Sequence, residues 1–232
     1  MKQEMIGEVP GNVFGMFADL IAYLGKLLKK KNPFAMSPTE EVGLEVLAEE
    51  RAEMLLNWEE FYKEFFDEDV DFTHLQVPER LEGFDRLIVV AKGMTAQLVY
   101  DRCADSFPCM KYTDRSLSEV VPTNEREPSN GPYAIWVRDT VEADEVHKNK
   151  SANKIKRYSI RSETLLERLL HGLKFYKETG KHLDISNVTL CAGSRDWFGV
   201  VPRVYWIADW MEVYWCNPGD ADDIFRAREV CS

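Results

Sequence analysis

The chain has 232 residues, a formal net charge of −11 and 45% hydrophobic residues, among them six Trp, nine Tyr and twelve Phe. This aromatic content excludes a disordered chain, and the acidic balance excludes a general affinity for nucleic acid over the whole surface. Five widely spaced cysteines without a Cys-x-x-Cys pair indicate reduced thiols in a cytoplasmic protein, rather than a disulfide framework or a structural zinc site.

The first 72 residues predict an acidic helical hairpin. Apolar residues in 13–28 recur at helical spacing, and this stretch is too short and too charged to span a membrane. A second helix begins after Ser37, which forms a capping box with Glu40, and continues to about residue 66. Residues 40–72 hold thirteen acidic and two basic side chains, so this segment carries the whole net charge.

Residues 73–232 predict a mixed α/β domain, entered through a linker at 67–83. Short β-branched or alternating runs predict strands, and runs with apolar residues every three or four positions predict helices. We expect strands over 85–91, 109–113 and 133–139 (the last half-buried), and helices over 95–107, 116–121 and 162–180. Thr95 and Ser162 are the expected N-caps, and Gly180 is expected to end the last helix. The steps from 85–91 to 133–139 suggest an α/β layer.

The end of the chain predicts an antiparallel, aromatic-rich meander built from 187–193, 203–209 and 211–217. The fold class is therefore α+β, with an N-terminal helical hairpin before the mixed domain. Alternation along these strands spreads four large side chains over both faces of the sheet: Tyr205, Trp206, Tyr214 and Trp215. One face fills a core, and the other is left to cover a helix, a partner or a ligand.

Several stretches together resemble a family of hypothetical bacterial proteins, over roughly residues 58–232. They are "WEEFYKEFF" (58–66), "GFDRLIVVAKGMT" (83–95), "YAIWVRD" (133–139), "ADEVHKNKSANKIK" (143–156) and "ETLLERLLHGLKFYKETGKHLDISNVTLCAGSR" (163–195). The last stretch is the most specific. The resemblance brings no activity, fold or ligand with it.

The first candidate site follows the helix at 162–180. A Cys or Ser nucleophile needs a base within hydrogen-bond reach and a third group that orients the base. His182 and Asp184 could serve Cys191 or Ser194 in these roles. The alternative is structural, with Cys191 in the core, Ser194 in a turn and His182 at the helix end.

Three arginines are candidate ligand-binding residues. Arg195 and Arg203 stand on either side of a turn and could bind a carboxylate or phosphate through paired hydrogen bonds. Arg138, at the end of the strand over 133–139, is the third. The alternative for Arg195 is a surface ion pair with Asp196 or Asp184.

The second candidate site is an acidic cluster just after the strand at 133–139. Asp139, Glu142, Glu145 and His147 offer the carboxylate and imidazole ligands of a Mg²⁺ or Mn²⁺ site for phosphoryl transfer or nucleic-acid processing. Their spacing matches no recognised metal motif, and acidic residues at a helix start also complement the helix dipole.

The absence of a convergent catalytic set favours an intracellular binding or assembly protein that acts through protein–protein contacts or self-association. This interpretation requires no cofactor, whereas the alternative, a metal-dependent enzyme, requires Mg²⁺ or Mn²⁺. The basic run at 147–161 holds six Lys or Arg and no acid, so it could meet phosphate. A solvated loop is the favoured interpretation of that run.

Overall fold

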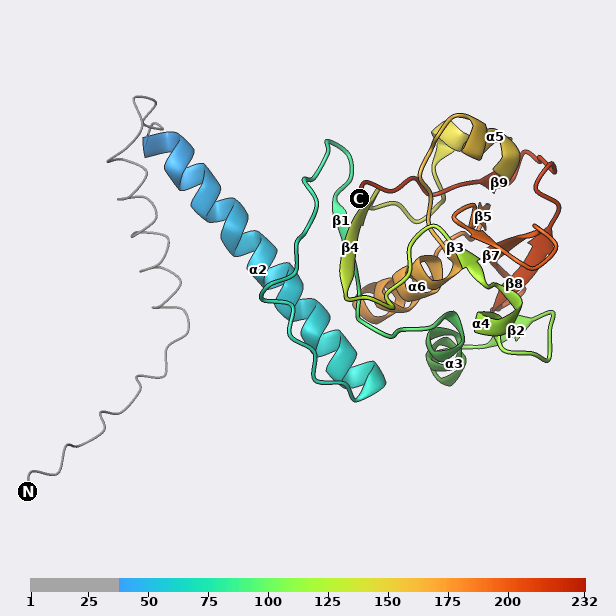
Figure 1. Ribbon diagram of the computed structural model, residues 1–232, viewed down its shortest axis with the longest axis horizontal. Coiled ribbons are helices and arrows are strands. Elements are labelled where there is room, and N and C mark those ends of the chain that lie inside the picture. The colour runs from blue at the N-terminus through green and yellow to red at the C-terminus, as the bar shows by residue number, and fades with distance from the viewer. Residues whose placement is uncertain (1–37) are drawn as a thin grey trace, which may run out of the picture. The chain divides into compact units, whose positions relative to one another are not determined.

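The computed structural model describes residues 38–232, with side chains described from residue 48 (Figure 1). The helix expected at 13–28 and the capping box of Ser37 and Glu40 lie outside the described residues. Helix α2 (Pro38–Phe66) ends where the sequence predicts. Residues 52–232 form one compact unit.

The described chain is an α+β fold. Its helices after α2 are α3 (Ala96–Ser106), α4 (Leu117–Val120), the 3-10 turn η1 (Glu145–His147), α5 (Ala152–Arg157) and α6 (Leu165–Thr179). Its strands are β1 (Arg86–Val90), β2 (Cys109–Lys111), β3 (Thr123–Asn124), β4 (Tyr133–Val137), β5 (Val188–Leu190), β6 (Ser194–Arg195), β7 (Val201–Ile207), β8 (Trp210–Cys216) and β9 (Phe225–Arg226).

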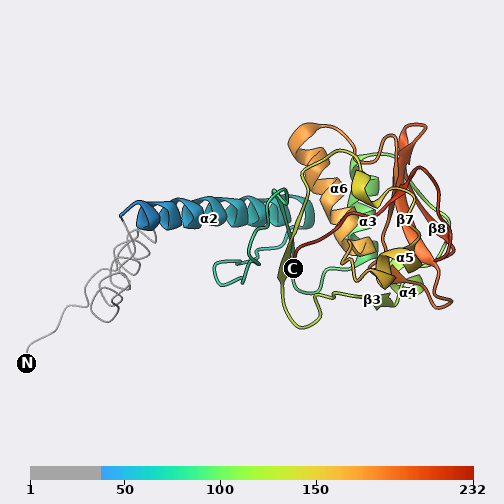
Figure 2. The same ribbon diagram turned by 90° about the horizontal axis from the view of Figure 1, so that it is seen from above.

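A five-stranded sheet with the order β2-β8-β7-β5-β9 forms the C-terminal part of the fold. Strand β7 runs antiparallel to β5 and β8, which confirms the predicted meander. Two short parallel edge strands, β2 and β9, extend it on either side. Helices α3 and α6 lie on one side of β7 and β8 (Figure 2), and we call this side of the sheet its inner face.

The two faces of the sheet carry different aromatic residues. Directly opposed residues share a face, and Arg203 opposes Tyr214 while Val204 opposes Val213. Val204, Val213 and their alternate neighbours Trp206 and Trp215 belong to the main core with α6. Arg203, Tyr205 and Tyr214 therefore lie on the outer face. Helix α5 covers part of that face by packing Ile155 in a second cluster with Leu190, Val201 and Phe225.

The remaining strands form small pairs outside this sheet. Strands β1 and β4 pair antiparallel in a ribbon of their own and are not part of the five-stranded sheet (Figure 1). The C-terminal half of α2 packs on the ribbon, where Trp58 Nε1 donates to the Leu87 carbonyl and the Tyr62 hydroxyl to that of Val89. Because the core covers both sides of β4, four of its five residues are buried rather than alternate ones.

Three local expectations need correction. Thr164, not Ser162, caps α6, because its hydroxyl accepts from the Glu167 amide while the Glu167 carboxylate accepts from the Thr164 amide. Residues 67–83 hold no helix or strand but are packed, since Phe72 is buried in the core. Residues 122–132 are rich in Pro, Asn and Gly, a composition that predicts an exposed loop. They nevertheless contain β3, which pairs with β6. Thr95 and Gly180 cap α3 and α6 as predicted.

Among residues 38–232, every helix is either too short or too polar for a bilayer crossing.

Candidate functional site

Cys191 and His182 do not meet as a nucleophile and its base. The Cys191 thiol is fully buried, and burial raises its pKa well above the ordinary value. The His182 ring stacks on the Trp206 indole, with 3.4 Å between ring centroids, and on Tyr176. No hydrogen bond joins the thiol to this imidazole among the described residues. A protonated thiol without a base is a poor nucleophile, so this pair has no catalytic geometry.

Asp184 is the centre of a buried ion-pair network. Its Oδ2 accepts from Arg168 Nε at 2.9 Å and from the Thr189 hydroxyl at 2.5 Å, while its Oδ1 accepts from Arg228 Nη2 at 2.7 Å and the Ala143 amide at 3.0 Å. Burial alone would raise the pKa of Asp184, but Arg228 and Arg168 hold it below the ordinary value. Every acceptor position is used, so Asp184 organises the fold and does not orient His182.

Ser194 joins two elements rather than acting as a nucleophile. Its hydroxyl oxygen accepts from the Leu165 amide at the start of α6 and donates to Asn124 Oδ1 on β3, at 2.9 and 2.6 Å. The side chain is fully buried. It therefore satisfies one of the free amide groups of the helix end.

The predicted metal ligands take separate structural partners. Asp139 pairs with Arg86 and Glu145 with Arg226. The Glu142 carboxylate accepts from the Ser186 amide and from the side chain of Asn187, both at 2.9 Å. The structure thus does not bring these three carboxylates together around one ion.

His147 belongs to a different cluster, in which Asp144 and Glu229 place ligand atoms within 4.8 Å of one another. Arg138 occupies this cluster by donating to Asp144 at 2.6 Å and to Glu229 at 3.0 Å. The ammonium group of Lys150 lies 3.1 Å from His147 Nδ1. Two cations therefore lie beside the two carboxylates and the imidazole, and together these side chains form an ion-pair cluster. Arg138 is a structural residue here.

The sequence interpretation missed a second buried pair, Glu163 and His171. Glu163 Oε1 lies 2.8 Å from His171 Nδ1, and both side chains are fully buried. Burial raises the pKa of Glu163 to about 8 and lowers that of His171 well below its ordinary value. Both pKa shifts favour the uncharged form of the two side chains. The local sequence does not show which polar residues in or next to a helix become buried. It therefore could not have predicted this pair.

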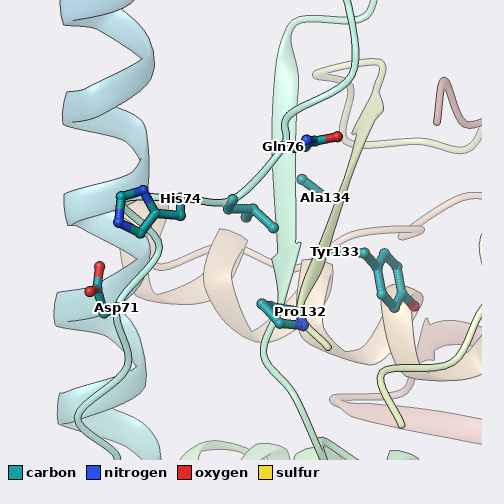
Figure 3. A pocket seen from close by; sticks show the side chains of 7 residues that line it. Asp71, His74, Gln76, Pro132, Tyr133 and Ala134 are labelled. Carbon is teal, nitrogen blue, oxygen red and sulfur yellow. The ribbon is translucent and has the colours of Figure 1, made fainter. Parts of the chain in front are cut away.

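A shallow hollow of about 380 Å³ lies between the loop that follows α2 and the start of β4 (Figure 3). Asp71, His74 and Gln76 from the loop line it, together with Pro132 and Tyr133. The Tyr133 hydroxyl donates to Glu167 and is already engaged. This hollow therefore does not combine an acid, a base and a nucleophile, as an active site would.

Arg195 and Arg203 both act on the thiol of Cys216. Burial raises its pKa to about 11, and the two guanidinium groups oppose that rise. Arg195 donates to the carbonyls of Ala192 and Ser194 and makes no ion pair with Asp196 or Asp184 among the described residues. The side chain of Arg203 forms neither an ion pair nor a hydrogen bond with a described residue. Its guanidinium lies 4.9 Å from the Tyr214 ring centroid and 5.5 Å from that of Tyr205.

The uncovered half of the outer face carries these residues, and we call it the aromatic face: Tyr112, Arg203, Tyr205, Trp210 and Tyr214. Tyr112 is 52% exposed and packs edge-on against Tyr214. Trp210 is also exposed, and the other three side chains are partly exposed. The aromatic face therefore combines flat apolar rings with a cation that no described acid neutralises.

A second exposed feature is the turn between β6 and β7. Phe198 is 90% exposed and Trp197 68%. Asp196 Oδ1 accepts from the amides of Phe198 and Val200 at 2.8 and 2.7 Å, and Gly199 takes a φ of 80°. The Trp197 indole donates to the Glu119 carbonyl. These bonds hold the turn in one shape while both rings point away from any core.

Comparison with known proteins finds no matching family model, no matching curated protein and no matching solved structure.

Proposed function

We propose that this chain is a non-enzymatic binding protein that contacts a protein partner through the turn bearing Trp197 and Phe198. The observation that carries the proposal is the exposure of Phe198 on a hydrogen-bonded turn. Large exposed apolar side chains mark interaction sites when they gather in one place. The partner supplies an apolar pocket that accepts the phenyl ring.

The rigidity of the turn supports this role. Ordering a loop on binding costs free energy, and a loop already held in its bound shape avoids that cost. Asp196 fixes the backbone on both sides of Phe198, and the Trp197 indole is anchored to Glu119. Burial of a phenyl ring contributes about 1.5–3 kcal/mol. We therefore expect Phe198→Ala to weaken partner binding about 30-fold, as at an interface hot spot.

The fate of the other candidate residues supports binding over catalysis. Cys191 is buried as a thiol, Asp184 is neutralised by two arginines, and Ser194 caps a helix. The proposal requires no metal, since Arg138 already pairs with both Asp144 and Glu229. We also propose the cytoplasm as the compartment, because all five cysteines are free.

Site-specific photo-cross-linking tests the proposal. Benzoylphenylalanine replaces Phe198 in one variant and Ile185, another exposed apolar residue, in a control variant. We expect a discrete adduct at position 198 in cells that encode the protein, competed by added wild-type chain but not by the Phe198→Ala variant. An adduct of twice the chain mass with purified protein alone would identify a second copy as the partner. Equal adducts at both positions, or none, would refute the proposal.

A further inference from the structure

The aromatic face has the two properties that single-stranded nucleic acid requires of a binding surface. Flat rings are needed because unpaired bases stack on aromatic side chains, and cations are needed because the backbone is a polyanion. Tyr112, Tyr205 and Tyr214 supply the rings from adjacent strands. Arg203 supplies a cation in their midst.

Arg203 is held in place by rings instead of acids. The Phe225 ring centroid lies 5.3 Å from its guanidinium, in addition to those of Tyr205 and Tyr214, and its Nε is buried without a hydrogen-bond partner among the described residues. Cation–π contacts fix the position of a guanidinium without using its N–H groups. The two Nη groups of Arg203 form no hydrogen bond with a described residue and remain available for a phosphate, which a planar guanidinium can bind in a bidentate manner.

Helix α5 borders the aromatic face with further positive charge. Its Ile155 packs in the cluster that contains Phe225, which is a neighbour of Arg203. Lys154, Lys156 and Arg157 are exposed, and none of the three forms an ion pair with a described residue. These cations therefore add positive charge to the helix that covers the neighbouring part of the outer face.

Two acids lie near this face, Glu212 and Asp220, and neither forms an ion pair with Arg203 among the described residues. Glu212 opposes Tyr205 on the outer face, but its side chain is buried and accepts a hydrogen bond from the Tyr205 hydroxyl. That bond orients the Tyr205 ring. The excess acidity of the chain lies in residues 40–72, outside the sheet.

We propose that the aromatic face binds single-stranded nucleic acid, with bases stacked on Tyr205 and Tyr214 and phosphates on Arg203 and α5. Base stacking on tyrosine is tolerant of sequence because every base has a flat π-face. Duplex is excluded from this mode, since its bases are already stacked on one another. This surface does not include Phe198, so it goes beyond the proposed protein contact.

Fluorescence anisotropy with a labelled 15-nucleotide oligo(U) at about 50 mM salt tests the proposal. We expect micromolar binding that weakens as salt increases, and Tyr214→Ala to weaken it about tenfold because one base can no longer stack. Arg203→Gln and the surface variant Lys154→Gln/Lys156→Gln should each lower the slope of log affinity against log salt, by about 0.7 for each phosphate that the variant no longer neutralises. The lysine variant alters exposed positions, so it keeps the test valid if the arginine variant unfolds.

Two matched controls separate this site from the rest of the protein. Lys92→Gln removes an exposed charge next to the β1–β4 ribbon and should leave oligo(U) affinity unchanged. Phe198→Ala should also leave it unchanged, so a failure here is distinguishable from a failure of the proposed protein contact.

Three results would overturn the proposal. The first is no anisotropy change at about 100 µM protein in about 50 mM salt, because nonspecific binding has a Kd of about 1–100 µM at physiological salt and is tighter at lower salt. The second is equal competition by poly-glutamate, which would assign the surface to an acidic protein segment. The third is equal binding of duplex together with full affinity in Tyr214→Ala, which would remove stacking from the mechanism.

Discussion

Asp184→Asn isolates the contribution of one buried charge to this fold. Asparagine has nearly the same shape and tolerates the left-handed backbone of this residue, whose φ is 59°. The substitution removes the negative charge but keeps the packing. Arg168 and Arg228 are both almost fully buried and would then lose the acid that neutralises them.

The expected loss of stability is large. Removing one partner of a buried ion pair costs about 3–5 kcal/mol, because an uncompensated charge remains in the interior. For a unit of this size that corresponds to a fall in the melting temperature of roughly 6–20 °C. The matched control is Asp139→Asn, whose carboxylate pairs with Arg86 but is 49% exposed. An exposed pair of this kind contributes less than about 1 kcal/mol.

Urea denaturation followed by circular dichroism and tryptophan fluorescence measures both variants at pH 7. The pH dependence adds a check with a definite sign. Because the folded-state pKa of Asp184 lies below its unfolded-state value, its contribution is present above the unfolded-state pKa and is lost as the pH falls through the folded-state pKa. Wild type should therefore lose its advantage over Asp184→Asn in acid. A variant within about 1 kcal/mol of wild type at pH 7 would refute the reasoning.

The other buried clusters lead to two further predictions. The pKa of Glu163 is raised to about 8 in the fold, so its contribution to wild-type stability is present below the unfolded-state pKa and is lost as pH rises toward 8. Glu163→Gln should abolish this decline, which chemical denaturation at pH 5, 7 and 9 would measure; an unchanged pH profile would contradict the assignment. Because Arg138 occupies the cluster around His147, Mg²⁺ or Mn²⁺ should move the melting temperature by less than about 1 °C. A clear rise that Glu142→Ala or His147→Ala abolishes would instead support a metal-dependent enzyme.

Elements with a strong local pattern were predictable from the sequence. The apolar stripe of α6, its closing Gly180 and the alternation of β7 and β8 each reflect contacts made within one segment. Strand β2 was predicted within 109–113, but its parallel pairing with β8 was not, and β9 was not predicted at all. β9 has only two residues, and its partner β5 is far from it in the chain, so pairing depends on tertiary packing that no local period records.

The candidate site was predictable as a region but not as a set of contacts. Asp184 and Arg203 were identified as candidate site residues. The two arginines that contact Asp184, Arg168 and Arg228, had the sequence signature of surface charges. Their burial depends on one carboxylate that lies well away in the sequence. Thr164 was detectable, because Thr-Leu-Leu-Glu is itself a capping-box pattern in which the glutamate is the third residue after the cap.

The alternation of β7 and β8 connects the fold to both proposals. It assigns Trp206 and Trp215 to the inner face, where they fill the core, and leaves Tyr205 and Tyr214 on the outer face. A shift in register of one residue would exchange the two sets and bury Arg203 without an acid. The Trp206 amide donates to the Asp184 carbonyl, so the buried network also helps to align β7.

Substitutions on the two faces of the sheet therefore test different properties of the protein. Truncation of Trp206 removes core packing together with the stacked His182 ring, so a loss of binding in that variant would not be separable from a loss of folding. Truncation of Tyr214 removes a partly exposed ring from a surface that no helix covers. If Tyr214→Ala lowered stability as much as a core substitution does, the outer face would be part of the core, and its aromatic residues would need no ligand to explain them.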